Sequence, residues 1–315
     1  MRATLLVIGL ALAAGATRAQ TIAVTPELAA VIEAARKEGQ LDLRSTSNVL
    51  GGPEGAKAAK EGIKKLFGVD LEVKWAPGPA YGPLAAILNQ ERQAGAKASS
   101  DAFSATAVQY SPYMEQGLFR RVEWQKLMPA RITDAIVESD SRLLRHDTSA
   151  PAILYNVQEA KWAPTIKTFD DLLAPRLKGQ FFTTPFLAGF DVMLSKDKWG
   201  VDSTTERVKK LAKQVGGLVG CEGLDRIASG EIPALVLDCA GAAHNNKRYR
   251  GKGILDVHVI PEMAQRRMSY FSVPAHAAHP NAGILYALYV SSPEGQEAIQ
   301  WEFNGGGLLD YADSR

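Results

Sequence analysis

Strand-like and helical patterns alternate along almost the whole chain, and this alternation limits the fold more than any other feature of the sequence. Residues 25–40 begin with Thr25 and Pro26 and carry apolar residues at helical spacing, which predicts a helix capped by Thr25. The residues that follow, LDLRSTSN, predict a short strand that ends in a small polar loop. Since alternating strands and helices favour parallel pairing, we predict an α/β fold with mixed, mostly parallel sheets.

Prolines and glycines predict where further helices begin and end. Pro53 and Gly68 delimit one helix, with Pro53 in the first turn and Gly68 as the C-cap. Near the C-terminus, HPNAGILYALYVSSPEGQEAIQWEF predicts two helices in series. Pro280 and Pro293 suit their first turns, and Ser292 suits the cap of the second helix.

The second half of the chain keeps the alternation. Thr168 and Asp171 form a capping-box pattern that predicts a helix at TFDDLL. Strands are predicted at VDLEVKWAP and SDAFSAT in the first half, and at SAPAILYNV, GQFFTTPF, PALVLDCAG and ILDVHVIPE in the second half, where RRMSYFSVP is a further extended stretch.

The first nineteen residues have the pattern of a secretory signal peptide. Arg2 is followed by an apolar run of about ten residues, which is too short to span a bilayer, and then by small residues. Cleavage after Ala19 would remove Arg2 and Arg18 and lower the basic residues from 36 to 34, against 34 acidic residues. Such a near-neutral chain argues against nucleic acid or an anionic membrane surface as a partner.

The cysteines and two of the histidines can be explained by structural roles. Cys221 and Cys239 can form a disulfide in an oxidising compartment, which we predict, or they can be two buried thiols, because sequence spacing does not fix disulfide geometry. His276 and His279 precede the proline-started helix at Pro280. Two histidines without further ligands are too few for zinc, so we interpret them as helix-entry residues and predict no metal and no cofactor.

Small polar residues follow several predicted strands. Parallel sheets place ligands at the carboxyl ends of strands, where helix N-termini direct free N–H groups towards them. Hydroxyl-rich loops at these ends suit a small polar or anionic solute, although each residue could equally be an ordinary turn or cap. The candidate ligand-binding residues are Ser45, Thr46, Ser47, Ala80, Tyr81, Thr106, Thr183, Thr184 and Asp238.

Several segments, taken in order, resemble bacterial family 1 extracellular solute-binding proteins, the periplasmic receptors of ABC importers. HPNAGILYALYVSSPEGQEAI is similar to their closing motif, and PTIKTFDDLLAPRLKGQ to their entry into the second lobe. GEIPALVLDCA and PLAAILNQERQAGAKASSDAF are similar to further segments of the family. The branch that holds the ferric-ion-binding proteins is the most similar.

This resemblance implies two α/β lobes with a ligand cleft between them. The implied divisions are a signal peptide at 1–19, a first lobe at 20–125 plus about 270–300, a second lobe at 126–269, and a C-terminal segment at 301–315 of uncertain lobe. It also implies a periplasmic, non-enzymatic, monomeric protein that delivers a small-molecule ligand to the membrane permease of an ABC importer by closing its cleft.

Two alternatives remain open. The ferric branch binds iron through an adjacent tyrosine pair, but here CAGAAHNN follows GEIPALVLD, so iron would need other tyrosines such as Tyr81, Tyr110 and Tyr113. A secreted α/β hydrolytic enzyme is the second alternative, because spacing alone does not exclude a Cys221–His244 nucleophile, although GxSxG and HExxH motifs are missing from the sequence.

Overall fold

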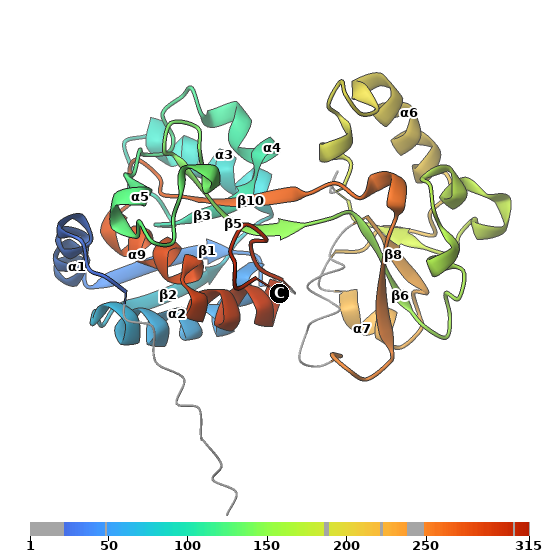
Figure 1. Cartoon of the computed structure of the whole chain (residues 1–315). Coiled ribbons are helices and arrows are strands. Elements are labelled where there is room, and N and C mark those ends of the chain that lie inside the picture. The colour runs from blue at the N-terminus through green and yellow to red at the C-terminus, as the bar shows by residue number, and fades with distance from the viewer. Residues whose placement is uncertain are drawn as a thin grey trace, which may run out of the picture.

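The computed structural model describes residues 22–47, 49–185, 189–220, 223–237, 249–304 and 306–314. They form two lobes that lie side by side, and the chain passes between them near β5 and β10 (Figure 1). Cys221, Cys239 and Asp238 lie outside the described residues, so the disulfide stays a prediction.

The first lobe is built from both ends of the described chain. Its elements are α1 (Pro26–Glu38), β1 (Gln40–Ser45), α2 (Gly52–Phe67), β2 (Glu72–Pro77), α3 (Tyr81–Gln93), β3 (Phe103–Thr106), α4 (Ala107–Tyr110), α5 (Trp124–Leu127), β4 (Val137–Glu138), β5 (Leu143–Ser149), β10 (Arg267–Ser272), α9 (Pro280–Ser291), α10 (Pro293–Gly295) and the π-helical segment Gln296–Asn304.

The second lobe holds the middle of the chain. Its elements are β6 (Ala152–Asn156), β7 (Phe182–Thr183), α6 (Gly200–Ala212), α7 (Leu224–Ala228), β8 (Ala234–Val236) and β9 (Leu255–Val259), with several short 3₁₀ turns between them. Its buried residues form cores separate from that of the first lobe.

Local capping chemistry accounts for the helix ends that the sequence predicts. The Thr25 hydroxyl accepts a hydrogen bond from the backbone N–H of Leu28 at 3.1 Å, and Ser292 accepts one from Gly295 at 3.0 Å. Gly68 adopts the left-handed conformation (φ 67°) that closes α2. The Thr168–Asp171 pair does form, but it leads into a 3₁₀ turn (Asp170–Leu173) rather than an α-helix.

The sheets differ from the predicted, mostly parallel arrangement. Among the described strands, β1–β2 and β7–β8 are the pairs that run in parallel, while the sheet β3-β10-β5-β4 is antiparallel throughout. The cause is the double crossing between the lobes. The chain leaves the first lobe after β5 and returns along β10, so the two strands pair in opposite directions. The fold is therefore α/β with mixed sheets.

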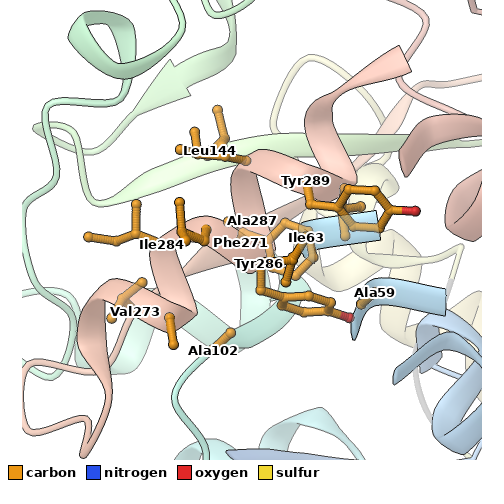
Figure 2. Close-up of a cluster of buried hydrophobic side chains, with 14 of the residues drawn as sticks. Ala59, Ile63, Ala102, Leu144, Phe271, Val273, Ile284, Tyr286, Ala287 and Tyr289 are labelled. Carbon is orange, nitrogen blue, oxygen red and sulfur yellow. The ribbon is translucent and has the colours of Figure 1, made fainter. Parts of the chain in front are cut away.

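Helix α9 forms the centre of the first lobe. Every residue from Ala282 to Ser291 is buried, as expected for a helix that is apolar on all sides. Figure 2 shows Tyr286 and Tyr289 of α9 beside Ile63 of α2 and Phe271 of β10.

The packing bears on the expected lobe divisions. Trp124, Ile136 and Leu144 belong to the core of the first lobe, so we propose that the chain enters the second lobe later, between β5 and β6. In the C-terminal segment, Leu308 is fully buried and the Gly307 carbonyl accepts a hydrogen bond from Thr148 of β5 at 3.3 Å. This segment packs on the first lobe.

Candidate functional site

A pocket opens at the carboxyl end of β1 and is lined by residues of several elements of the first lobe. This end of β1 is directed towards the second lobe (Figure 1). Residues from β1, β3, β10 and the start of α3 contribute to its lining. Ser45, Thr46 and Ser104 supply hydroxyl groups, and Phe271 and Tyr286 are the aromatic residues that connect the pocket to the core.

The pocket brings together part of the predicted site. Ser45, Thr46 and Tyr81 line it. Ala80 is the exposed N-cap of α3, and no side chain caps this helix, whose positive end lies at the pocket through Tyr81. Ser47 is exposed just beyond Thr46 and does not contribute to the lining.

The other predicted residues lie elsewhere. Thr106 is buried and forms a capping box with Gln109 at the start of α4, which is a structural role. In the second lobe, the Thr183 hydroxyl donates a hydrogen bond to the Val236 carbonyl at 3.0 Å, and Thr184 is buried next to it. Their part in ligand binding stays a prediction.

Sequence reasoning missed several residues of the pocket because they lie within strands. Arg44 precedes Ser45 in β1, Trp75 lies in β2, and Ser104 lies in β3. The predicted strand end at Ser45 and Thr46 does lie at the pocket. The side chains that strand residues direct into the pocket depend on which strands pair, and that pairing was not visible in the sequence.

The charge of the pocket is one-sided. Arg44 is the only charged residue among the described residues that line it, and no Asp or Glu is found in that lining. The Arg44 guanidinium contacts the Ser99 hydroxyl at 3.3 Å. A pocket with one cation and no carboxylate favours an anionic ligand over a cationic one.

Two serine hydroxyls in the pocket are hydrogen-bonded to neighbouring side chains. The indole N–H of Trp75 donates to Ser45 Oγ at 3.0 Å. Ser104 Oγ lies 2.9 Å from Nε2 of His146, and Nδ1 of His146 contacts the Gln300 amide nitrogen. His146 and Gln300 are almost fully buried.

Two neighbouring residues of β5, His146 and Asp147, have pKa values shifted by burial. Burial lowers the pKa of His146 from 6.5 to about 3, so its imidazole is neutral at physiological pH. Burial raises the pKa of Asp147 from 3.8 to about 7, although the positive charge of Arg267 partly opposes this shift. Arg267 also forms an ion pair with Asp191 of the second lobe at 2.7 Å.

Of the three tyrosines considered as iron ligands, one lines the pocket and two do not. Tyr81 lines the pocket. Tyr110 is 1 % exposed, its hydroxyl donates towards the carbonyl oxygens of Phe103 and Tyr270 at 2.7 and 2.9 Å, and burial raises its pKa. Neither Tyr110 nor Tyr113 contributes to the pocket lining.

The one group of potential metal ligands found among the described residues consists of Asp42, Asp101 and His279. Asp101 is fully buried and accepts hydrogen bonds from the backbone N–H groups of Asp42 and His279 at 2.7 and 2.8 Å. Nδ1 of His279 lies 2.9 Å from the same carboxylate. These bonds tie α9 to β1, which agrees with a helix-entry role for His279.

His279 is the N-cap residue of α9, but its side chain does not cap the helix. The carboxylate of Glu38, at the end of α1, instead accepts hydrogen bonds from the N–H groups of Asn281 and Ala282 at 3.2 and 2.8 Å. The predicted helix start is confirmed, and a residue more than 200 positions away supplies its cap.

Within the described residues, no helix combines the length and apolar character that crossing a membrane requires. No protein-family profile matches the sequence, and no curated protein matches it.

Solved structures do match. Iron-bound HitA from Pseudomonas aeruginosa aligns with a TM-score of 0.64 and 16 % identity, covering 83 % of each chain. The periplasmic binding protein AfuA from Actinobacillus pleuropneumoniae, with fructose 6-phosphate bound, aligns with a TM-score of 0.65 and 17 % identity, covering 85 % of this chain and 83 % of AfuA.

The substrate-binding protein PotD of a spermidine/putrescine ABC transporter from Streptococcus pneumoniae aligns with a TM-score of 0.58 and 14 % identity, covering 83 % of this chain and 80 % of PotD. At such identities the likeness concerns the fold, and it confirms at that level the resemblance seen in the sequence. The chain has the two-lobe α/β fold of the periplasmic substrate-binding proteins of ABC transporters.

Proposed function

We propose that this protein is a periplasmic solute-binding protein that delivers a small, polar, anionic solute to an ABC importer. The observation that carries the proposal is the pocket at the carboxyl end of β1, whose described lining contains Arg44 and no carboxylate. Solved proteins of the same fold bind solutes of different charge, so the charge of the lining is what favours an anion here. The signal-like N-terminus supports the location.

Binding would close the two lobes on the solute. The pocket belongs to the first lobe, and we propose that Thr183, Thr184 and Asp238 contribute from the second lobe. Two short connections, after β5 and before β10, join the lobes and leave room for a hinge. We expect the protein to act as a monomer and to pass the solute to the permease without chemical change.

The ferric alternative has less support from the pocket. Fe(III) favours several anionic oxygen ligands, and the described lining offers no carboxylate. Tyr110 has its hydroxyl bonded inside the first lobe. The hydrolase alternative rests on Cys221 and His244, which lie outside the described residues, and nothing in the described lining supports it.

The test is a thermal-shift screen of the mature protein against inorganic phosphate, sugar phosphates, carboxylates, ferric citrate and spermidine. A ligand at about 100 times its Kd adds roughly 2.7 kcal/mol to the free energy of unfolding. Each stabilising compound is then titrated by calorimetry, and small-angle scattering measures the radius of gyration with and without it. We expect an anion to bind and the protein to become more compact.

Arg44→Gln and Lys57→Gln form a matched pair for this test. Both remove one positive charge, but Arg44 lines the pocket and Lys57 is exposed on α2. We expect Arg44→Gln to weaken anion binding about tenfold and Lys57→Gln to leave it unchanged, because a charged hydrogen bond contributes about 1.5 kcal/mol or more. Equal effects, or binding of spermidine alone, would contradict an anion receptor.

A further inference from the structure

Three side chains from distant parts of the sequence form a line that ends at the pocket. Gln300 of the π-helical segment contacts His146 of β5, and His146 contacts Ser104 of β3, which lines the pocket. Gln300 and His146 are 0 % and 1 % exposed. Buried polar groups of this kind are hydrogen-bonded to fixed partners, which gives the protons of the line defined positions.

The Gln300 amide has only one possible orientation. Its nitrogen lies 2.9 Å from the backbone carbonyl oxygen of His146, and a carbonyl oxygen can only accept a hydrogen bond. The amide group that faces His146 is therefore the NH₂ donor. The same nitrogen contacts Nδ1 of the imidazole, so Nδ1 must accept.

This contact fixes the tautomer of His146. A neutral imidazole carries one proton, and when Nδ1 accepts a hydrogen bond the proton lies on Nε2. Burial keeps His146 neutral, since it lowers the pKa to about 3, and the Phe271 ring lies 4.1 Å from the imidazole between ring centroids. Nε2–H then donates to Ser104 Oγ at 2.9 Å.

The hydroxyl of Ser104 is thereby left as a donor. Its oxygen accepts a hydrogen bond from Nε2–H of His146, and its own O–H cannot donate to that N–H group. Ser45 is in the same position, because the Trp75 indole nitrogen is a donor only and lies 3.0 Å from Ser45 Oγ. Both serines line the pocket, so each can present its proton to a bound molecule.

We infer that the pocket binds an oxyanion group of the solute, a carboxylate or a phosphate, through the hydroxyl protons of Ser45 and Ser104, and that His146 and Gln300 are positioning residues that keep the Ser104 proton directed at the ligand. The inference rests on the proposed function and specifies its solute class. An ammonium group carries only donors and cannot accept the hydroxyl protons of Ser45 and Ser104, so we expect the pocket to bind it more weakly than an oxyanion.

The first measurement needs no variant and no ligand. Nitrogen-15 NMR of the labelled, mature protein distinguishes the two neutral imidazole tautomers and the imidazolium. We expect His146 to carry its proton on Nε2 between pH 6 and pH 8. A proton on Nδ1 would overturn the inference, whatever the protein binds.

The second measurement is calorimetric titration with inorganic phosphate, fructose 6-phosphate, citrate and spermidine. We expect Ser104→Ala to weaken the binding of each oxyanion that binds by about tenfold or more, as for a hydrogen bond to a charged group. Gln300→Met, which removes the donor to Nδ1, should move the His146 proton partly to Nδ1 and weaken oxyanion binding although Ser104 is intact. Ser111→Ala, exposed and outside the pocket lining, is the control and should change nothing.

The outcomes separate this inference from the proposed function. Oxyanion affinity that stays within twofold in Ser104→Ala, or binding of spermidine and of none of the three oxyanions, overturns the inference and leaves a solute-binding protein. Failure of all four compounds to bind overturns both. Oxyanion binding that is lost in Ser104→Ala and retained in Ser111→Ala supports both.

Discussion

His146 and Asp147 should give this protein two opposite pH dependences that nearly cancel. The pKa of His146 is 6.5 in the unfolded chain and about 3 in the folded protein, so between these pH values only the unfolded chain binds a proton at this residue. Lowering the pH therefore destabilises the fold through His146. Asp147 has a raised folded pKa, from 3.8 to about 7, so the folded protein keeps a proton that the unfolded chain releases. Its contribution therefore falls as the pH rises towards 7.

The size of each effect follows from the interval between the folded and unfolded pKa values of the residue. Each pH unit within a shifted interval changes the free energy of unfolding by about 1.4 kcal/mol per residue. Between pH 6.5 and pH 5 both intervals apply, with opposite signs. Each residue then contributes a change on the order of 2 kcal/mol, and the wild-type protein shows little net change from this pair.

Single substitutions separate the two contributions. Between pH 6.5 and pH 5, the free energy of unfolding of His146→Asn should rise by about 2 kcal/mol relative to that of the wild-type protein, because only the contribution of Asp147 remains. The free energy of unfolding of Asp147→Asn should fall by about 2 kcal/mol over the same pH interval, because only the contribution of His146 remains. Since all other groups titrate in every variant, these differences isolate the two residues.

The assay is urea unfolding followed by circular dichroism at several pH values between 5 and 7.5. Asp202→Asn, an exposed position on α6, serves as the control and should follow the wild-type profile. Constant m-values would show that the unfolded states are comparable. If both variants differ from the wild-type protein by the same amount at pH 5 and pH 6.5, the burial argument for the two residues is refuted.

Three further predictions concern the helix α9 and the ferric alternative. Glu38→Ala should lower the free energy of unfolding by about 1–2 kcal/mol through the lost cap of α9, whereas Glu33→Ala on the exposed face of α1 should have little effect in the same denaturant titration. Gly283→Ala should cost about 1–3 kcal/mol or more, because its Cβ would lie 2.2 Å from the Asp101 carbonyl oxygen; an unchanged melting temperature would show that the backbone there can shift. Finally, the purified protein should stay colourless with ferric citrate, since Tyr110 has its hydroxyl bonded inside the lobe; a visible charge-transfer band would favour the iron receptor.

The local parts of this structure could be predicted from the sequence. Thr25, Gly68 and Ser292 end or begin helices because their own side chain or backbone conformation satisfies groups within four residues. Such contacts depend on neighbours in the sequence, so a short pattern is sufficient to identify them. The overall fold also followed, through the order of segments that resemble a known family.

Contacts between distant residues could not be predicted in this way. The antiparallel pairing of β5 with β10 joins residues more than 100 positions apart and reversed the expected direction of the sheet. The same holds for the site. Ser45 and Tyr81, which line the pocket, were predicted because they adjoin strand and helix ends. The role proposed for Ser104 depends on His146 and Gln300, and no sequence pattern connects these three residues.

The discontinuous core of the first lobe has a consequence for the order of folding. Helix α9 buries its side chains against α1 and α2, and Glu38 caps it from 244 positions earlier than Ala282. The cores of the second lobe draw on residues 152–263 alone. Synthesis proceeds from the N-terminus, so all residues of the second lobe are made before α9. The second lobe can therefore fold while the first lobe still lacks α9, and the segments that are made first complete their packing last. Until α9 is made, the apolar faces of α1 and α2 that pack against it remain exposed to water.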